Sequence, residues 1–338
     1  MKGKRVVVTG GSGFIGSHLV HLLLERGADV TVIARYGNVM KNERLRDCWE
    51  DIRVVEADLR NRGALAGLRE FAPQVVFHLA AYNHVGQSFQ QVEECFDVNA
   101  KGTANLLDSC DGIEKFVYMS TSEVYGKQDE VPFVETMTPE PISPYAITKY
   151  AGELYCRMKQ RIKGETSIVI VRPFNVYGPY QSTKAVIPEL IIGCLMGRPI
   201  RTTRGEQTRE FNYVSDTVAG LIKAAECESR IDGVINIASG HDVAIKDLVR
   251  KIAELTGTSS LLEIGALPDR PTEIWRMYAD NTRAREILDW QPSVGLEEGL
   301  RRTIEWFREY LPQLQNRRAR NTEGHPTVPR ESSATTTA

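Results

Sequence analysis

The stretch Thr9-Gly10-Gly11-Ser12-Gly13-Phe14-Ile15-Gly16 follows the apolar run Val6–Val8 and opens an amphipathic segment, Phe14–Arg26. Three of its glycines are spaced GxxGxxG. Glycines placed this way permit a tight turn after a strand and let backbone N–H groups approach a pyrophosphate, which the positive end of the following helix also attracts. The stretch therefore predicts a dinucleotide site. A glycine-rich turn without a ligand is the alternative, and the strand-before, helix-after context argues against it.

The same alternation of strand and helix continues through the first half of the chain. The expected strands are Arg5–Val8, Val30–Ala34, Arg53–Glu56, Val75–His78, Lys115–Met119 and Ser167–Val171. The amphipathic stretches between them are Phe14–Arg26, Leu65–Phe71, Val92–Ser109 and Tyr145–Ile162. This order predicts an α/β fold with a doubly wound parallel sheet, because such units cross over right-handedly and cover both faces of the sheet.

The pattern changes after Arg172-Pro173, where prolines interrupt it and helical segments recur at Asp216–Glu226, Ile245–Leu255 and Gly295–Tyr310. We interpret residues 1–172 as a dinucleotide-binding domain. Residues 173–312 are interpreted as a smaller, mainly substrate-binding domain, some of whose segments return to the first. Residues 313–338 are rich in Arg, Asn, Ser and Thr, and we expect a disordered tail because they offer little apolar surface to bury.

Composition excludes several classes of protein. Of the 338 residues, 42% are hydrophobic and 25% are charged, which is typical of a globular protein. Lys and Arg number 42 and Asp and Glu 44, so the net charge of −2 predicts no binding to nucleic acid or to an anionic membrane. The six cysteines lack metal or redox spacing, and neither a signal peptide nor a membrane-spanning stretch is apparent. We therefore expect a soluble, cytoplasmic protein without a metal site.

The end of the second expected strand bears on the choice of cofactor. An acidic residue there accepts hydrogen bonds from the ribose hydroxyls of NAD. Here Ala34 stands at or near that position and Arg35 follows it, which suits the 2′-phosphate of NADP. NADP is therefore favoured. NAD is the alternative, with Arg35 as a solvated loop side chain. Asp58, after the third strand, either accepts from the adenine amine or caps the next helix.

Two further segments carry groups suited to acid–base chemistry. Tyr145 and Lys149 lie four residues apart on an expected helix, hence on one face, where an ammonium beside a phenol lowers the pKa of the phenol. The strand Lys115–Met119 leads into Ser120-Thr121-Ser122-Glu123. Because the carboxyl ends of parallel strands face the cofactor, we expect this segment to reach the same cleft as the tyrosine, a general base for work near neutral pH.

Together these segments resemble the extended short-chain dehydrogenase/reductase family, in its nucleotide-sugar-modifying branch. The matching motifs are TGGSGFIG (Thr9–Gly16), HLAA (His78–Ala81), NAKGTANLL (Asn99–Leu107), STSEVYG (Ser120–Gly126), SPYAITK (Ser143–Lys149), RPFNVYGP (Arg172–Pro179), REFNYVSD (Arg209–Asp216), RPTEI (Arg270–Ile274) and DNTRAREIL (Asp280–Leu288). The resemblance covers about residues 4–310. It implies a Rossmann-type sheet with a smaller C-terminal substrate-binding domain.

The resemblance also implies three sets of site residues. The catalytic set is Thr121, Ser122, Glu123, Tyr145 and Lys149. The cofactor-binding set is Gly10, Gly13, Phe14, Ile15, Gly16, Arg35, Asp58, Leu59, Leu79, Ala80, Ala81, Tyr145 and Lys149. The substrate-binding set is Ser88, Asn175, Arg209 and Arg270. The two arginines of the last set suit a diphosphate, because a guanidinium fork matches phosphate oxygens.

Within the family, Glu123 separates the reactions. Carbon-4 epimerases of this branch commonly carry a small or apolar residue there, whereas 4,6-dehydratases and UDP-glucuronate decarboxylases carry a carboxylate. Thr121-Ser122-Glu123 resembles the GDP-mannose and N-acetylhexosamine 4,6-dehydratases, while the glucose-type dehydratases have Asp in place of Ser122. The favoured function is an NAD(P)-dependent nucleotide-sugar 4,6-dehydratase, a carbon–oxygen lyase. A decarboxylase or a 4-epimerase is the alternative, and a non-catalytic dinucleotide-binding protein is a more distant one.

The implied reaction uses a UDP- or GDP-linked hexose or N-acetylhexosamine. Tyr145, assisted by Lys149 and Thr121, takes the proton of the carbon-4 hydroxyl while hydride passes to the nicotinamide. Glu123 then removes the carbon-5 proton, water leaves from carbon 6, and hydride returns to carbon 6, which gives a 4-keto-6-deoxy sugar nucleotide. The family further implies a homodimer paired through Val92–Ser109 and Tyr145–Ile162.

Overall fold

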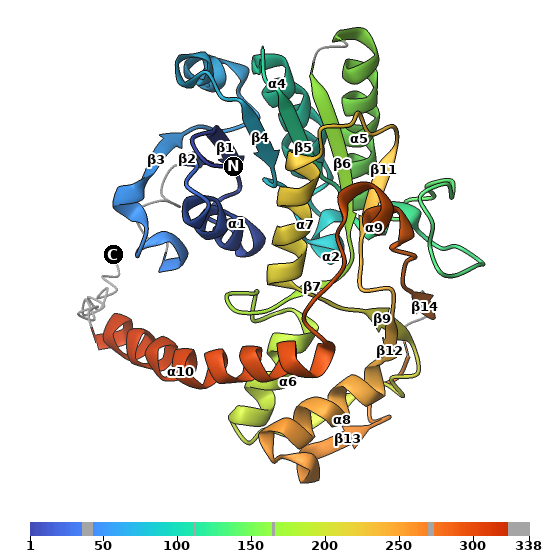
Figure 1. The fold of residues 1–338 in the computed structure, drawn as a ribbon. Helices are drawn as coiled ribbons and strands as arrows, with labels where there is room; N and C mark the ends of the chain where they lie inside the picture. The colour runs from blue at the N-terminus through green and yellow to red at the C-terminus, as the bar shows by residue number, and fades with distance from the viewer. Residues whose placement is uncertain (36–42, 111, 164–165, 270–273, 324–338) are drawn as a thin grey trace, which may run out of the picture.

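The computed structural model describes residues 1–35, 43–110, 112–163, 166–269 and 274–323. At its centre is a sheet of seven parallel strands (Figure 1). Across the sheet they lie in the order β11 (Val234–Ile237), β6 (Ser167–Pro173), β5 (Lys115–Met119), β4 (Val75–His78), β1 (Arg5–Thr9), β2 (Asp29–Ala34) and β3 (Ile52–Glu56). Runs such as Val6–Val8 are fully buried, as parallel strands covered on both faces require.

Helices cover both faces of this sheet (Figure 1). α1 (Phe14–Glu25) and α7 (Val214–Glu226) pack in the larger apolar core, on one face. The opposite face is covered by the 3-10 helix η3 (Arg62–Phe71), α4 (Gly102–Ser109) and α5 (Pro144–Lys163). The predicted doubly wound sheet is confirmed, and it brings the carboxyl ends of β1 to β6 to one edge.

Six of the seven strands lie where the sequence predicted them. The seventh, β11, comes from the second half of the chain and returns to the edge of the sheet beside β6. The sequence analysis also missed α6 (Val186–Leu195), an almost entirely apolar helix in which half of the residues are buried. Because such a helix needs no polar face, its residues do not show the helical alternation of apolar and polar side chains.

A smaller lobe lies below the sheet in Figure 1. Its helices are α6, α8 (Ile245–Thr256) and α10 (Leu296–Glu323). Its short strands are β7 (Val176–Tyr177) with β10 (Asn212–Tyr213), β8 (Ile200–Thr202) with β13 (Leu262–Ile264), and β9 (Thr208–Glu210) between β12 (Asp242–Ala244) and β14 (Arg276–Met277). None of the described helices is long and apolar enough to cross a membrane.

Two helical segments differ from the prediction. Val92–Ser109 is not one regular helix: α3 (Val92–Cys95) passes through a π-helical turn, η4 (Phe96–Lys101), before α4 begins. α10 continues past Gln313, where the sequence predicted a disordered tail, to Glu323. Its added residues include Gln, Leu, Arg and Ala, which extend an existing helix at low cost. Residues 324–338 lie outside the described chain.

Candidate active site

The glycine-rich turn after β1 is built for close approach. Gly10 has φ +70, and a Cβ there would lie 2.7 Å from the backbone nitrogen of Ala80. A Cβ on Gly16 would overlap the carbonyl oxygen of Gly10. Gly13 caps α1 without a side chain, so the first backbone N–H groups of the helix are left for a ligand. The turn therefore fits the pyrophosphate that the sequence predicted.

A cavity of about 630 Å³ lies over this turn and crosses the carboxyl ends of β3, β2, β1, β4 and β5. Among its lining residues are eleven of the thirteen predicted cofactor-binding residues, namely Gly10, Gly13, Phe14, Ile15, Gly16, Arg35, Asp58, Leu59, Leu79, Ala80 and Ala81. The sequence analysis missed other lining residues, including Tyr82, Gln91, Glu94 and Met119. We call this space the dinucleotide cavity, because its glycine cradle and its run along the strand ends fit that class of ligand.

The predicted catalytic residues meet where β5 ends and α5 begins. Thr121 caps the short helix η5 (Ser122–Tyr125), its side chain accepting a hydrogen bond from the backbone N–H of Glu123 at 3.2 Å. Thr121 is also hydrogen-bonded to Tyr145, in the first turn of α5. Ser122 is buried beside them. The structure thus brings together the predicted threonine, serine, carboxylate and tyrosine.

Burial dominates the ionisation of the catalytic tyrosine and lysine. It raises the pKa of Tyr145 to about 12, with Glu123 adding to the rise and Thr121 opposing it. It lowers the pKa of Lys149 to about 8. The Lys149 ammonium lies 4.3 Å from the centre of the Tyr118 ring. The predicted shift of the Tyr145 pKa toward neutrality is therefore wrong in this structure, because burial of the phenol dominates and Lys149 is not among the causes of the shift.

The side chain of Glu123 is half-buried. Burial raises its pKa, and the positive charge of Arg209 opposes that rise. Arg209 Nη1 itself donates to the carbonyl oxygens of Thr208 and Ile274, at 2.8 and 2.7 Å. The carboxyl group thus stands between the catalytic tyrosine and an arginine of the smaller lobe.

A buried ion pair between Glu153 and Arg172 lies next to these residues in the fold. Glu153 follows Lys149 by one turn of α5 and is fully buried. Its carboxylate accepts from the Ser120 hydroxyl at 2.6 Å and from Arg172 Nε and Nη2 at 2.9 and 2.7 Å. The pair ties α5 to the end of β5 and to β6. The sequence analysis assigned Glu153 no role.

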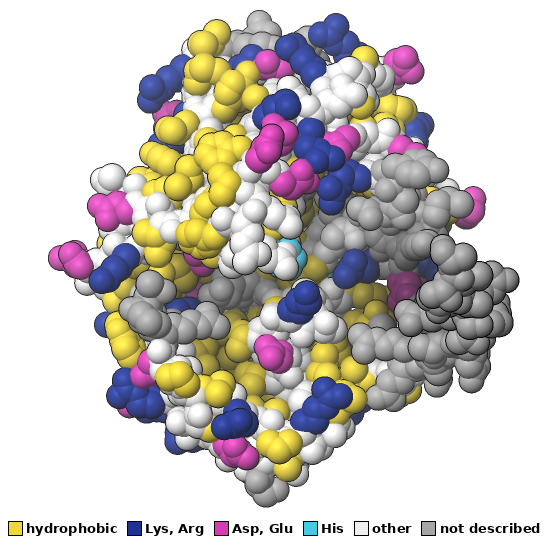
Figure 2. Space-filling model, turned by 180° about the vertical axis from the view of Figure 1, so that it is seen from behind, with side chains coloured by type: hydrophobic (Ala, Val, Ile, Leu, Met, Phe, Trp, Pro, Cys, Tyr) yellow, Lys and Arg dark blue, Asp and Glu magenta, His cyan; other side chains and the backbone are white. Residues whose placement is uncertain are grey.

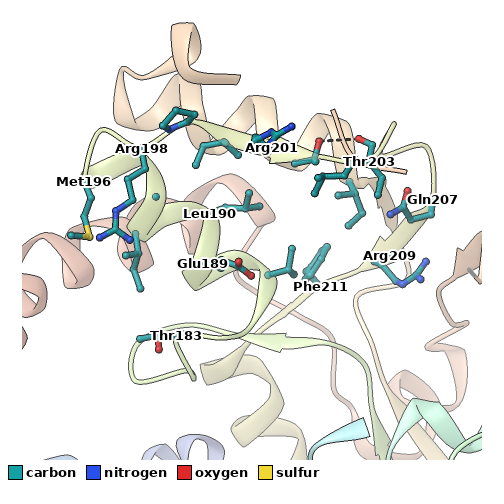
Figure 3. A pocket seen from close by; sticks show the side chains of 18 of the residues that line it. Thr183, Glu189, Leu190, Met196, Arg198, Arg201, Thr203, Gln207, Arg209 and Phe211 are labelled. Atoms are coloured by element: carbon teal, nitrogen blue, oxygen red, sulfur yellow. Dashed lines mark hydrogen bonds between the residues drawn. The ribbon is translucent and has the colours of Figure 1, made fainter. Parts of the chain in front are cut away.

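A second cavity, of about 860 Å³, lies in the smaller lobe. Of the predicted substrate-binding residues, Asn175 and Arg209 line it. Figure 3 shows Glu189, Leu190 and Phe211 facing Arg201 and Thr203 across it. We call this space the substrate cavity.

Of the other two predicted substrate-binding residues, the structure describes only Ser88. Ser88 is fully buried, and its hydroxyl donates to the carbonyl oxygen of Val85 at 2.6 Å. Its hydroxyl is therefore bonded within α2 (Val85–Ser88), and Ser88 lines neither cavity. Arg270 lies outside the described residues. Asn175 lines the second cavity, but its Nδ2 already donates a hydrogen bond to the carbonyl oxygen of Glu210, at 2.9 Å.

Comparison with known proteins places this geometry. The model of a family described as GDP-mannose 4,6-dehydratase matches residues 7–303. A dTDP-D-glucose 4,6-dehydratase of Bos taurus is 32% identical over 93% of this chain and 91% of its own. A UDP-N-acetyl-alpha-D-glucosaminuronate decarboxylase of Bacillus cytotoxicus is 34% identical over 90% of this chain and 98% of its own.

A solved structure agrees. The UDP-glucuronic acid 4-epimerase of Bacillus cereus, in complex with UDP-glucuronic acid and NAD, has a TM-score of 0.83 with 31% identity, and the match covers 90% of this chain and 99% of that one. One fold and one kind of cleft therefore serve relatives that dehydrate, decarboxylate and epimerise nucleotide sugars.

Proposed function

Because the chain belongs to the GDP-mannose 4,6-dehydratase family of extended short-chain dehydrogenases/reductases, whose members modify nucleotide sugars, we propose that it is a nucleotide-sugar 4,6-dehydratase. The observation that carries the proposal is Glu123, a half-buried carboxyl group beside the tyrosine. Burial raises its pKa, and a carboxylate with a raised pKa is a stronger base. Proton removal from carbon 5 is the step of a 4,6-dehydratase that needs such a base.

The dinucleotide cavity supports a nicotinamide cofactor. When bound, the nicotinamide supplies a hydride acceptor for carbon 4 and then a hydride donor for carbon 6. The glycine turn and the start of α1 would hold the pyrophosphate, and Asp58 and Leu59 lie at the far end of the cavity, at the end of β3. Met119, at the end of β5, marks the end nearest the catalytic residues.

Tyr145 acts as the base for the carbon-4 hydroxyl. Thr121, which is hydrogen-bonded to the tyrosine, holds that hydroxyl beside it. A pKa of about 12 leaves little phenolate at neutral pH. The Lys149 ammonium, one turn away, is the charge that stabilises the phenolate as the proton leaves. Glu123, whose charge acts on Tyr145, then takes the carbon-5 proton.

The substrate cavity supports a sugar nucleotide. Arg198, Arg201 and Arg209 line it, and guanidinium groups suit a diphosphate bridge. The proposed substrate is a UDP- or GDP-linked hexose or N-acetylhexosamine. A second candidate function, decarboxylation of a nucleotide-linked uronic acid, is favoured by the position of Arg209, because a cation near Glu123 also suits a carbon-6 carboxylate.

Product analysis tests the proposal. The purified protein is incubated with a panel of UDP-, GDP-, dTDP- and CDP-linked hexoses, N-acetylhexosamines and uronic acids, and products are identified by mass spectrometry. The proposal expects loss of water from one of the hexoses or N-acetylhexosamines, and no product with Tyr145→Phe. Loss of carbon dioxide from a uronic acid would favour the second candidate, and an isomer of unchanged mass would indicate an epimerase.

We also propose that the protein is a homodimer. α2 and α3 pack beside α5. Large apolar side chains are exposed on α5, at Leu154 and Ile162, and directly after α2 and α3, at Phe89 and Phe96. Figure 2 shows hydrophobic side chains gathered over the part of the molecule that carries the large sheet. Isologous pairing of such helices would bury this surface.

A further inference from the structure

The far end of the dinucleotide cavity contains a carboxylate from an unexpected element. Glu94, on α3, lines the cavity together with Arg35 and Asp58. Its Oε2 lies 2.6 Å from Arg60 Nη1, and its Oε1 lies 3.8 Å from Arg35 Nη1. Arg60 also binds Asp58, at 2.5 to 3.0 Å. A chain of alternating charges therefore runs from Arg35 through Glu94 and Arg60 to Asp58.

The position of this chain of charges identifies the part of the cofactor that would meet it. Arg35 directly follows β2, and Asp58 lies two residues after β3. Both strands are at the opposite end of the cavity from β5 and the catalytic residues. With the pyrophosphate on the glycine turn after β1, the adenosine half extends toward β2 and β3. Its ribose would therefore lie near Arg35 and Glu94, which line that end of the cavity.

The charges at this end balance, because two guanidinium groups face two carboxylates. A ribose 2′-phosphate would bring about two more negative charges next to Glu94, and Arg35 is already within ion-pair distance of that carboxylate. An unphosphorylated ribose instead offers hydroxyl groups, which donate to a carboxylate without repulsion. The side chain of Glu94 is one-third exposed, so water and salt screen its charge only in part.

We propose that Glu94 is a specificity-determining residue that makes the cavity prefer NAD to NADP. It supplies, from α3, the carboxylate that is missing at Ala34 on the end of β2, and it neutralises the arginine that would otherwise attract a 2′-phosphate. The inference rests on the proposed function, in which this cavity holds a nicotinamide cofactor. It reverses the preference for NADP that Ala34 and Arg35 suggested, because the local sequence does not show which distant side chain meets Arg35.

Binding measurements test the inference without turnover. The dissociation constants of NAD⁺ and NADP⁺ are measured by isothermal titration calorimetry for the wild-type protein and for Glu94→Gln, which removes the charge and keeps the shape. Glu93→Gln is the matched control, because Glu93 is the exposed neighbour on α3 and does not line the cavity. We expect the wild-type protein to bind NAD⁺ more tightly. Glu94→Gln should improve NADP⁺ binding about tenfold relative to NAD⁺, the effect of one partly screened charge, and Glu93→Gln should leave the ratio unchanged.

A wild-type preference for NADP⁺, or an unchanged ratio in Glu94→Gln, would overturn the inference. If Glu94→Gln does not fold, competition by ADP and by 2′,5′-ADP against NAD⁺ on the wild-type protein decides the matter: ADP should compete better, and the reverse order would contradict the role of Glu94. If both dinucleotides bind with an unchanged ratio, the proposed dehydratase still stands. If neither binds, the inference and the proposed function both fail.

Discussion

At the scale of single residues, the site contains groups whose charges are costly to bury. Lys149 is 1% exposed, and its ammonium is close to the Tyr118 ring and to the buried Glu153. The aromatic ring compensates for only part of the lost hydration. A buried lysine with a lowered pKa therefore lowers the free energy of unfolding, as is common for residues of active sites.

Lys149→Met should stabilise the ligand-free protein at pH 7. The pKa of the folded-state lysine is about 8, against about 10.4 when it is unfolded. Below pH 8 the folded protein holds a buried charge, and between these two values the unfolded chain binds more protons, so stability rises with pH. The variant removes the penalty, which raises the free energy of unfolding by about 1–3 kcal/mol at pH 7, while activity falls at least about 100-fold.

Urea unfolding at pH 7 and pH 10 checks this prediction. The gain from Lys149→Met should shrink at pH 10, where the wild-type lysine is neutral. Lys184→Met, at an exposed lysine, is the control and should leave stability unchanged at both pH values. A loss of stability in Lys149→Met at pH 7 would show that the ammonium is stabilising where it lies.

Much of the site could be predicted at this scale. Short motifs contain the glycines of the turn and Thr121, Glu123, Tyr145 and Lys149. The spacing within each motif indicates which residues share one face of an element. Glu94 could not be predicted, because its proximity to Arg35 depends on where tertiary packing places α3. Local sequence also could not give the pKa of Tyr145, since burial by distant residues decides it.

At the scale of elements, the catalytic segment depends on how α5 is fixed to the sheet. Glu153 and Arg172 are 0% and 1% exposed, and the carboxylate also holds Ser120, the residue just before Thr121. Removing one member of a buried pair leaves the other charge without compensation. The pair therefore positions the loop that carries Thr121 and Glu123.

Glu153→Gln should lower the free energy of unfolding by about 3–5 kcal/mol, because it leaves the Arg172 guanidinium buried and unpaired. Replacing both residues, as Glu153→Met with Arg172→Met, should restore most of that loss. Glu297→Gln is the control: it breaks an exposed pair with Arg301 on α10 and should not change the melting temperature measurably. Equal melting temperatures for Glu153→Gln and the wild type would contradict this role.

The elements themselves were predicted where alternation is clear. α1 and α5 lie within a few residues of their expected bounds, because each has an apolar stripe and a defined start. α6 was missed because it is almost entirely apolar, and β11 because four residues carry too little pattern. The π-helical turn η4 also has no local signature, since it belongs to the packing of this segment against α5.

At the scale of the whole molecule, α5 presents an apolar stripe that the described part of the chain leaves exposed. Ile147, Leu154, Met158 and Ile162 are 40–72% exposed and recur at helical spacing along one face. A monomer that left them in water would be unusual. The family resemblance implied a homodimer and the helices that pair in it, and the exposed stripe is the structural reason to expect one.

Sedimentation velocity at micromolar concentration should show a dimer for the wild-type protein. Leu154→Asp, in the middle of the stripe, should shift the protein to a monomer, because a carboxylate at the centre of an apolar interface is not solvated. Leu267→Asp changes a similarly exposed leucine in the substrate cavity and should remain dimeric. A wild-type monomer would refute the proposed assembly.

The assignment of the reaction rests on Glu123, and its direct test is single-turnover absorbance of Glu123→Gln with the accepted substrate in heavy water. If Glu123 is the carbon-5 base, the variant still oxidises carbon 4 and the near-ultraviolet absorbance of reduced nicotinamide builds up. Product should then form about 10²–10⁴-fold more slowly than in the wild type, with no solvent deuterium at carbon 5. Normal turnover of the variant, with deuterium still entering carbon 5, would contradict the account.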